Sequence, residues 1–315
     1  MTVCIAAACR SGEYTVTATD GSLTLGVESV DRALTKMYWI SNADEAWQFL
    51  YAGETSEIDL ILENVRQEIV GNPKAISREQ VQKTVRMAYK KRLAEWTEDY
   101  VLAPYDMTMK EFKKEGRKIF GDDLAARLAR DMSDTVASFK GELMVVGWGK
   151  TSRSVMIYGV NQSGAWSGSL TGLAAIGSGR EVAMSALLLY RITRDSSLED
   201  TIYAVAAAKF SAERCDGVGK NTTVCVSRKQ NPKDKNDERK PFQFLESEEI
   251  DRLRKLWEKY GQPRIPTEGY DVMMKIAQRT SGGVGPGSIV KLLDGISRRK
   301  RQTTRSASQK SEDQR

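Results

Sequence analysis

The candidate catalytic residues that open this sequence are a threonine, an aspartate and a lysine near its start. The sequence contains no histidine. Ser-His-Asp triads, Cys-His dyads and histidine-ligated zinc sites are therefore excluded, and a nucleophile here has to be activated by an amine or a carboxylate. Thr2 stands directly before the apolar run "VCIAAAC" at 3–9, and Asp20 and Lys36 follow, sixteen residues apart. The opening has three interpretations: a targeting segment, an ordinary buried strand, or a strand that begins with a nucleophile.

The targeting interpretation is the weakest of the three. The apolar run is too short for a signal peptide, and no basic residue precedes it. No stretch approaches the ~18 consecutive apolar residues that a membrane span needs. We therefore expect a cytoplasmic protein without a membrane partner.

The elements that would position these residues form separate blocks of strands and helices. Alternating and apolar runs predict strands at 3–9, 13–19, 36–40, 46–52, 142–149, 154–160 and 222–228. Helical spacing predicts two helices between 55 and about 96, the second beginning after Ser77 as its cap, a charged helical section at 101–140, and helices near 180–194 and 198–213. This segregated order favours antiparallel sheets covered by helices.

One stretch near the start resembles a known family. "TATDGSLTLGVESVDRALTK" (17–36) is similar to the start of proteasome β-type subunits and of the bacterial proteasome-like peptidases called Anbu, with the same interval from aspartate to lysine. The interval from Thr2 to Asp20 is two residues longer, which a longer hairpin at "RSGE" accommodates. "YAGETSE" (51–57), "AIGSGREVAMSALL" (175–188) and "RCDGVGK" (214–220) resemble later landmarks of the family in the same order.

The resemblance implies the fold and the catalytic residues. The fold would be an α+β, αββα sandwich of the N-terminal-nucleophile hydrolase type. Thr2 would be nucleophile and base, Lys36 would lower the pKa of its amine, and Asp20 would hold Lys36. The remaining catalytic positions would be Gly53 as oxyanion donor, Ser178 near the amine, and Asp216 orienting Ser178. The family's serine three residues after that aspartate is Gly219 here.

The chemistry of such a site needs neither metal nor cofactor, and we expect none. A free α-amine has a pKa of about 7.7–8.0, and a nearby lysine cation lowers it further. The amine then takes the hydroxyl proton of the threonine, which attacks a peptide carbonyl and forms an acyl-enzyme. The amine becomes free only when Met1 is removed, and threonine is small enough for methionine aminopeptidase to do so.

The resemblance also implies a substrate pocket and an assembly. Tyr51 would form the floor of the primary pocket and Leu23, Leu34 and Thr55 its walls, which favours small or medium apolar side chains. The substrate would be a peptide or an unfolded polypeptide, cut inside a self-compartmentalising ring or stack of subunits. Whether an unfoldase feeds that chamber is left open.

The rest of the chain divides by composition. We expect a proteasome-like domain at 1–228, enlarged by helices at 101–140, then a charged linker at 229–241, a helical extension at 242–280 and a Gly-rich, then basic tail at 281–315. Within the extension, a helix at 246–260 carries an apolar face in which Trp257 would anchor a contact with another subunit. Residues 297–315 hold seven Lys/Arg and two Asp/Glu, so +5 of the net +6 belongs to the tail and not to the folded body.

Three alternatives remain beside the peptidase. The chain is a catalytically inactive structural subunit if Met1 is retained. It is a small-amide hydrolase if the same fold takes another substrate. In the third, function lies in the basic tail as a tether for nucleic acid or a partner, although the near-neutral body does not favour nucleic acid. The cysteines of the predicted strands, Cys4, Cys9 and Cys225, are expected to be buried apolar side chains without disulfides.

Overall fold

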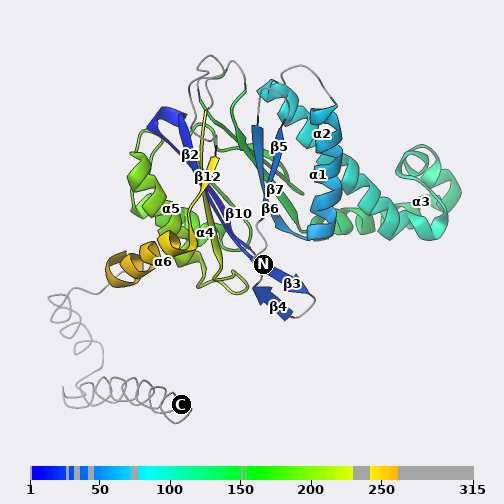
Figure 1. The fold of residues 1–315 in the computed structure, drawn as a ribbon. Helices are drawn as coiled ribbons and strands as arrows, with labels where there is room; N and C mark the ends of the chain where they lie inside the picture. Colours follow the sequence, from blue (N-terminus) through cyan, green and yellow to red (C-terminus); the bar gives the residue numbers. More distant parts are fainter. Residues whose placement is uncertain are drawn as a thin grey trace, which may run out of the picture. The chain divides into compact units, whose positions relative to one another are not determined.

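Two antiparallel five-stranded sheets lie against each other, with helices on their outer faces (Figure 1). The computed structural model describes residues 2–25, 28–31, 36–41, 46–71, 77–149, 152, 154–229 and 242–261. All of these belong to a single unit that spans residues 1–261. The order of layers is helices, sheet, sheet, helices, so the predicted αββα sandwich is confirmed.

The first sheet carries the start of the chain at its centre. Its strand order is β10 (Leu173–Ile176), β1 (Cys4–Cys9), β2 (Tyr14–Asp20), β11 (Thr222–Arg228) and β12 (Phe242–Phe244). Every residue of β1 is buried. Ile5 and Ala7 face the helices, whereas Cys4, Ala6 and Ala8 face the second sheet. Burial on both faces explains why this strand reads as an unbroken apolar run and not as an alternating one.

The second sheet has the order β5 (Met37–Ser41), β6 (Ala46–Gly53), β7 (Gly141–Gly147), β8 (Met156–Asn161) and β9 (Gly164–Ser167). A separate two-stranded hairpin of β3 (Ser22–Leu25) and β4 (Glu28–Asp31) occupies the interval between Asp20 and Lys36. Leu50, Ala52 and Met144 pack toward the first sheet, so a continuous apolar layer joins the two sheets.

Two pairs of helices cover the sandwich. The first sheet is covered by α4 (Arg180–Leu189) and α5 (Leu198–Ala212), and the second by α1 (Thr55–Val70) and α2 (Arg78–Thr97). A 3-10 turn, η1 (Arg10–Gly12), links β1 to β2 as the predicted hairpin. The predicted cap at Ser77 is confirmed, because its side chain accepts the N–H of Gln80 and the Gln80 side chain accepts the N–H of Ser77.

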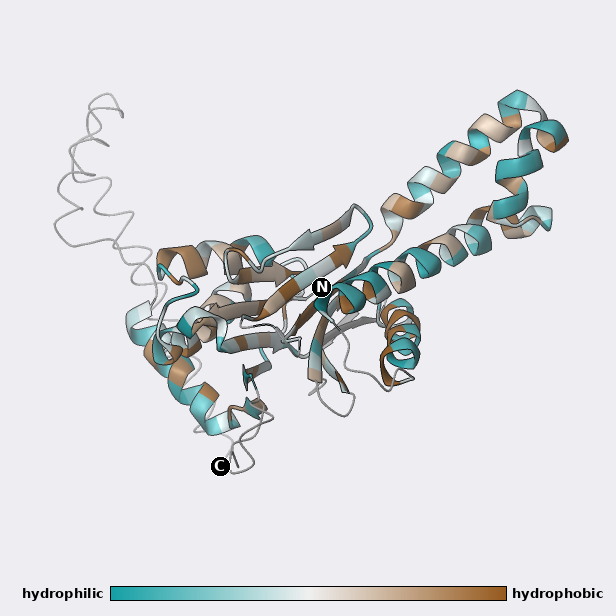
Figure 2. Cartoon of the chain, turned by 90° about the horizontal axis from the view of Figure 1, so that it is seen from above, coloured by the Kyte–Doolittle hydropathy of each residue, from teal (hydrophilic) through white to brown (hydrophobic). Residues whose placement is uncertain are grey.

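The helical section predicted at 101–140 is a π-helical turn η2 (Glu98–Leu102), a 3-10 turn η3 (Ala103–Tyr105) and the long helix α3 (Met109–Ser138). It has a small core of its own, composed of Val101, Leu102, Leu128 and Met132. Many of its other residues are hydrophilic (Figure 2). This section therefore depends on a core separate from that of the sandwich.

The segment after the predicted linker packs on the same chain. β12 pairs with β11, and α6 (Ser247–Leu256), followed by η4 (Trp257–Gly261), lies against α5. Trp257 is only 7% exposed, with its ring 5.7 Å from that of Phe210. The prediction that Trp257 anchors a contact between subunits is therefore wrong: it fills the core of its own chain. The linker after Lys229 and the predicted extension and tail after Gly261 lie outside the described residues.

Among the helices that the structure describes, none is both long and apolar enough to cross a membrane.

Candidate active site

The centre of the candidate site is a buried ion pair between Lys36 and Asp20. Lys36 Nζ lies 3.3 Å and 3.4 Å from the two carboxylate oxygens of Asp20, and the two side chains are 5% and 0% exposed. Asp20 ends β2, and Lys36 stands directly before β5, so the pair joins the two sheets. The interval between them includes the β3–β4 hairpin.

Two main-chain groups fix the Asp20 carboxylate. Oδ1 accepts the N–H of Val3 at 3.0 Å, and Oδ2 accepts the N–H of Gly219 at 3.1 Å. Hydrogen bonds of this kind stabilise the charged form of a carboxylate. Because Val3 follows Thr2 directly, the Asp20–Lys36 pair is held within one residue of the predicted nucleophile.

Thr2 itself is 3% exposed and is held by the turn between β10 and α4. Its N–H donates to Ser178 Oγ at 3.2 Å, Ser178 Oγ donates to the Thr2 carbonyl at 3.3 Å, and the N–H of Gly179 donates to the same carbonyl at 3.2 Å. Gly177 has φ +87°, and a Cβ there would lie 2.3 Å from the Thr2 carbonyl oxygen. The glycine-serine-glycine turn is thus needed for close approach to Thr2.

Gly53 ends β6 in a conformation that other residues avoid. Its φ is +100°, and a Cβ would lie 1.4 Å from the carbonyl oxygen of Lys140. The preceding residue, Ala52, lies near Thr2. A Cβ added to Gly177 would lie 2.3 Å from the Thr2 carbonyl oxygen and 3.3 Å from the Ala52 Cβ, so both are close to the same point. The end of β6, where the predicted oxyanion donor stands, is thus adjacent to the start of β1.

Asp216 is not placed as expected. Its side chain is exposed, and within the described part of the chain no hydrogen bond joins it to Ser178. The group that reaches the site from this loop is the main-chain N–H of Gly219, which binds Asp20. Gly219, which stands where the family that the sequence resembles has a serine, therefore contributes its main-chain N–H. A glycine provides this group as well as a serine does.

The predicted substrate residues are described only in part. Tyr51 is half-buried against the α1 side of the second sheet. Burial raises the pKa of the Tyr51 hydroxyl, with added contributions from Cys4 and from Asp59 on α1. Thr55 is exposed at the first position of α1. Of Leu23 only the backbone, in β3, is described, and Leu34 lies outside the described residues.

Two residues near the site were not anticipated from the sequence. Glu142, on β7, pairs in register with Ala52 and accepts the N–H of Gly177 at 2.9 Å, so one residue joins the end of β6 to the turn that holds Thr2. Cys4 donates to the carbonyl of Tyr51 at 3.2 Å. Burial, reinforced by the charge of Asp20, raises the pKa of the Cys4 thiol, so it stays protonated. Neither residue belongs to a motif that the sequence makes visible.

Among the residues that the structure describes, no group of three or more Cys, Asp or Glu side chains is placed to hold a metal ion.

Comparison with known structures identifies the fold. The chain resembles a chain from the structure of the helical assembly of the Anbu complex from Pseudomonas aeruginosa (TM-score 0.55, 13% identity, covering 85% of this chain and 99% of that one). It also resembles a Gly-1 mutant of Anbu from Hyphomicrobium sp. strain MC1 (TM-score 0.54, 14% identity, 82% and 94%). A third match is Anbu, the ancestral β-subunit, from Yersinia bercovieri (TM-score 0.53, 12% identity, 84% and 100%).

No protein-family model matches the sequence, and no curated protein matches it. At these identities the likeness shows the fold alone. The fold is nevertheless the one that the residues at 2–36 predicted, and the similarity extends over nearly the full length of each Anbu chain.

Proposed function

We propose that this protein is a threonine-type peptidase whose nucleophile is Thr2, released as the first residue when the peptide bond before it is cut. The observation that supports this most strongly is the buried Lys36–Asp20 pair, whose carboxylate binds the N–H of Val3, next to Thr2. A buried ion pair is weak evidence for stability, since apolar residues would fill the same space at no greater cost. The position of the pair next to Thr2 is explained if the pair takes part in catalysis.

In the proposed reaction the α-amine of Thr2 is the base. The Lys36 cation disfavours a second positive charge nearby and so keeps the amine neutral near pH 7. The amine takes the Thr2 hydroxyl proton as Oγ attacks the peptide carbonyl, and the oxyanion is stabilised by the N–H of Gly53. The proton passes to the leaving amine, the acyl-enzyme remains on Oγ, and water activated by the same amine releases it.

Ser178 has a positioning role in this scheme. Its Oγ already binds both the nitrogen and the carbonyl oxygen of Thr2. After cleavage, the same oxygen would accept a proton of the free amine and keep its lone pair directed toward the Thr2 hydroxyl.

We further propose that copies of the chain associate in the cytoplasm and enclose the sites. Leu188 and Leu189, near the end of α4, are 64% and 78% exposed. Exposed apolar side chains that lie together are a candidate contact surface between subunits. Enclosure would keep folded proteins away from the nucleophile.

Hydrolysis by the purified chain tests the proposal. A panel of fluorogenic peptides with small or medium apolar residues before the cut bond should be hydrolysed by the wild type. Thr2→Ser should retain activity and Thr2→Ala should have none, because serine keeps both the hydroxyl and the amine. Turnover of small amides but not of peptides would replace the peptidase by a small-amide hydrolase. No turnover of either, with Thr2 as the first residue, would favour a structural subunit.

A further inference from the structure

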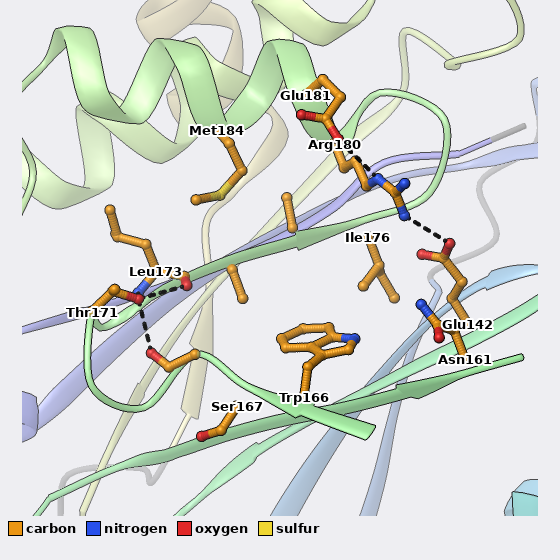
Figure 3. Close-up of a pocket in the computed structure, with 13 residues that line it drawn as sticks. Glu142, Asn161, Trp166, Ser167, Thr171, Leu173, Ile176, Arg180, Glu181 and Met184 are labelled. Atoms are coloured by element: carbon orange, nitrogen blue, oxygen red, sulfur yellow. Dashed lines mark hydrogen bonds and ion pairs between the residues drawn. The ribbon is translucent and has the colours of Figure 1, made fainter. Parts of the chain in front are cut away.

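A cavity of about 350 Å³ lies where the edge strand β10 of the first sheet faces the edge strand β9 of the second (Figure 3). Trp166 on β9 and Met184 on α4 provide apolar walls on opposite sides of β10. Thr171 lies at one end, and the ion pair of Glu142 and Arg180, separated by 3.2 Å, lies at the other. The cavity thus extends along β10 toward the turn that holds Thr2.

The main chain of β10 faces this cavity. β10 pairs only with β1, so alternate residues direct their N–H and C=O groups away from the sheet. The carbonyl of Gly172 accepts the N–H of Ala8 at 2.7 Å, which fixes the phase of this alternation. The outward groups are then those of Leu173, Ala175 and Gly177.

The outward groups on either side of Ala175 are already bound by their own chain. Thr171 Oγ1 accepts the N–H of Leu173 at 3.3 Å and donates to its carbonyl at 3.2 Å. The N–H of Gly177 donates to Glu142 at 2.9 Å, and its carbonyl accepts the N–H of Arg180 at 3.2 Å. Nothing in the described ranges binds the outward N–H and C=O of Ala175, the residue between these two.

We propose that this cavity binds one residue of an extended polypeptide substrate, which exchanges a pair of main-chain hydrogen bonds with Ala175. One residue of an extended chain offers the matching acceptor and donor side by side. Because the outward main-chain groups of Leu173 and Gly177 are already hydrogen-bonded, the pairing is limited to a single residue. This prevents β10 from acting as an open edge for aggregation. The walls of Trp166 and Met184 favour an apolar side chain beside that residue.

This inference rests on the proposed peptidase, because it takes the occupant to be substrate. Ala175 pairs with Ile5, which lies three residues along the chain from Thr2, and this places the cavity about 10 Å from Thr2 at the rise of an extended strand. A chain of a few residues beyond the cut bond therefore spans the distance. Short substrates do not reach the cavity, and longer ones do.

The test uses Ala175→Pro, with Ala175→Ser as matched control. Proline removes the outward N–H without breaking a hydrogen bond to β1, and edge positions tolerate it, whereas serine keeps the N–H. In a Thr2→Ala background, binding of a fluorescein-labelled unstructured peptide with a central leucine is followed by anisotropy. In the wild-type background, kcat/KM is compared for a short fluorogenic substrate and for one extended by several residues.

Ala175→Pro should weaken binding of the labelled peptide about fivefold and lower kcat/KM for the extended substrate by the same factor, as expected for one hydrogen bond. Ala175→Ser and the short substrate should show no change. Absence of binding, or equal binding by both variants, would overturn the cavity assignment, as would a change of oligomer mass in Ala175→Pro without a change in peptide binding. If binding depends on Ala175 and the wild type hydrolyses nothing, the peptidase fails and the peptide site stands.

Discussion

Replacing Lys36 by alanine should separate the catalytic from the structural role of the buried ion pair. The side chains of Lys36 and Asp20 are 5% and 0% exposed, so the substitution leaves a carboxylate in the core without its cation. Breaking a buried pair in this way costs about 3–5 kcal/mol. Asp20 keeps the N–H groups of Val3 and Gly219, so we expect a loss of about 3 kcal/mol, near the lower limit of that range.

The effect on activity follows from the charge. A nearby cation lowers the pKa of an amine by like-charge repulsion. In the proposed mechanism, loss of the Lys36 cation therefore raises the pKa of the Thr2 amine and leaves less of the neutral base at pH 7. We expect at least a tenfold loss of turnover at pH 7, equivalent to about 1.4 kcal/mol. The acid limb of the pH–rate profile should move to higher pH, with partial recovery of the rate in alkaline buffer.

The matched control is Arg92→Ala, which breaks another largely buried pair, between Arg92 on α2 and Glu57 on α1. Arg92 and Glu57 are 12% and 10% exposed with 2.5 Å between Nε and Oε2. Urea unfolding should show a comparable loss of stability in both variants, whereas turnover per folded molecule should fall only in Lys36→Ala. A Lys36→Ala variant that retains more than about a tenth of wild-type turnover, or whose acid limb does not move, would refute the reasoning.

Three further substitutions test other parts of the site and the proposed assembly. Gly53→Ala should lower the free energy of unfolding by more than about 3 kcal/mol, because its Cβ would lie 1.4 Å from a carbonyl oxygen. Gly121→Ala, at φ +76° and ψ 168° with open space around it, has backbone strain without a clash and should cost about 1–3 kcal/mol in the same denaturant titration, less than Gly53→Ala. Ser178→Ala should lower kcat about tenfold, the equivalent of one charge-assisted hydrogen bond, with KM nearly unchanged; an equal change in both would show substrate binding instead. Leu189→Glu should reduce the oligomer mass in light scattering, whereas Leu60→Glu, on α1 and 49% exposed, should not; equal masses in both variants would place the contact elsewhere.

Much of the sandwich is predictable from the sequence because its strands and helices have strong local patterns. The apolar run at 3–9 and the helical spacing at 55–70 are visible without any long-range information. The pair of Asp20 and Lys36 was predictable for another reason: the interval between them matches that of a known family. The helix at 246–260 shows the limit, since an apolar face does not reveal whether it meets its own chain or another. Trp257 packs on Phe210 of its own chain.

Contacts made by the main chain were the least predictable part of the site. The Gly219 N–H that binds Asp20 leaves no signature in residue type, so the sequence drew attention to Asp216, which is exposed. Glu142 was also missed, because its contact with Gly177 joins residues 35 positions apart, one on β7 of the second sheet and one in the turn that follows β10 of the first. Such contacts depend on how the two sheets are placed, which local periodicity does not specify.

The central claim is that Thr2 begins the mature chain and attacks as an N-terminal nucleophile. Intact-mass spectrometry of the purified protein, with and without an inhibitor that reacts covalently with N-terminal threonine, tests it most directly. The account predicts a chain whose first residue is Thr2 and a single inhibitor adduct, absent from Thr2→Ala. A chain that retains the residue before Thr2, or a processed wild type that gains no adduct, would contradict it.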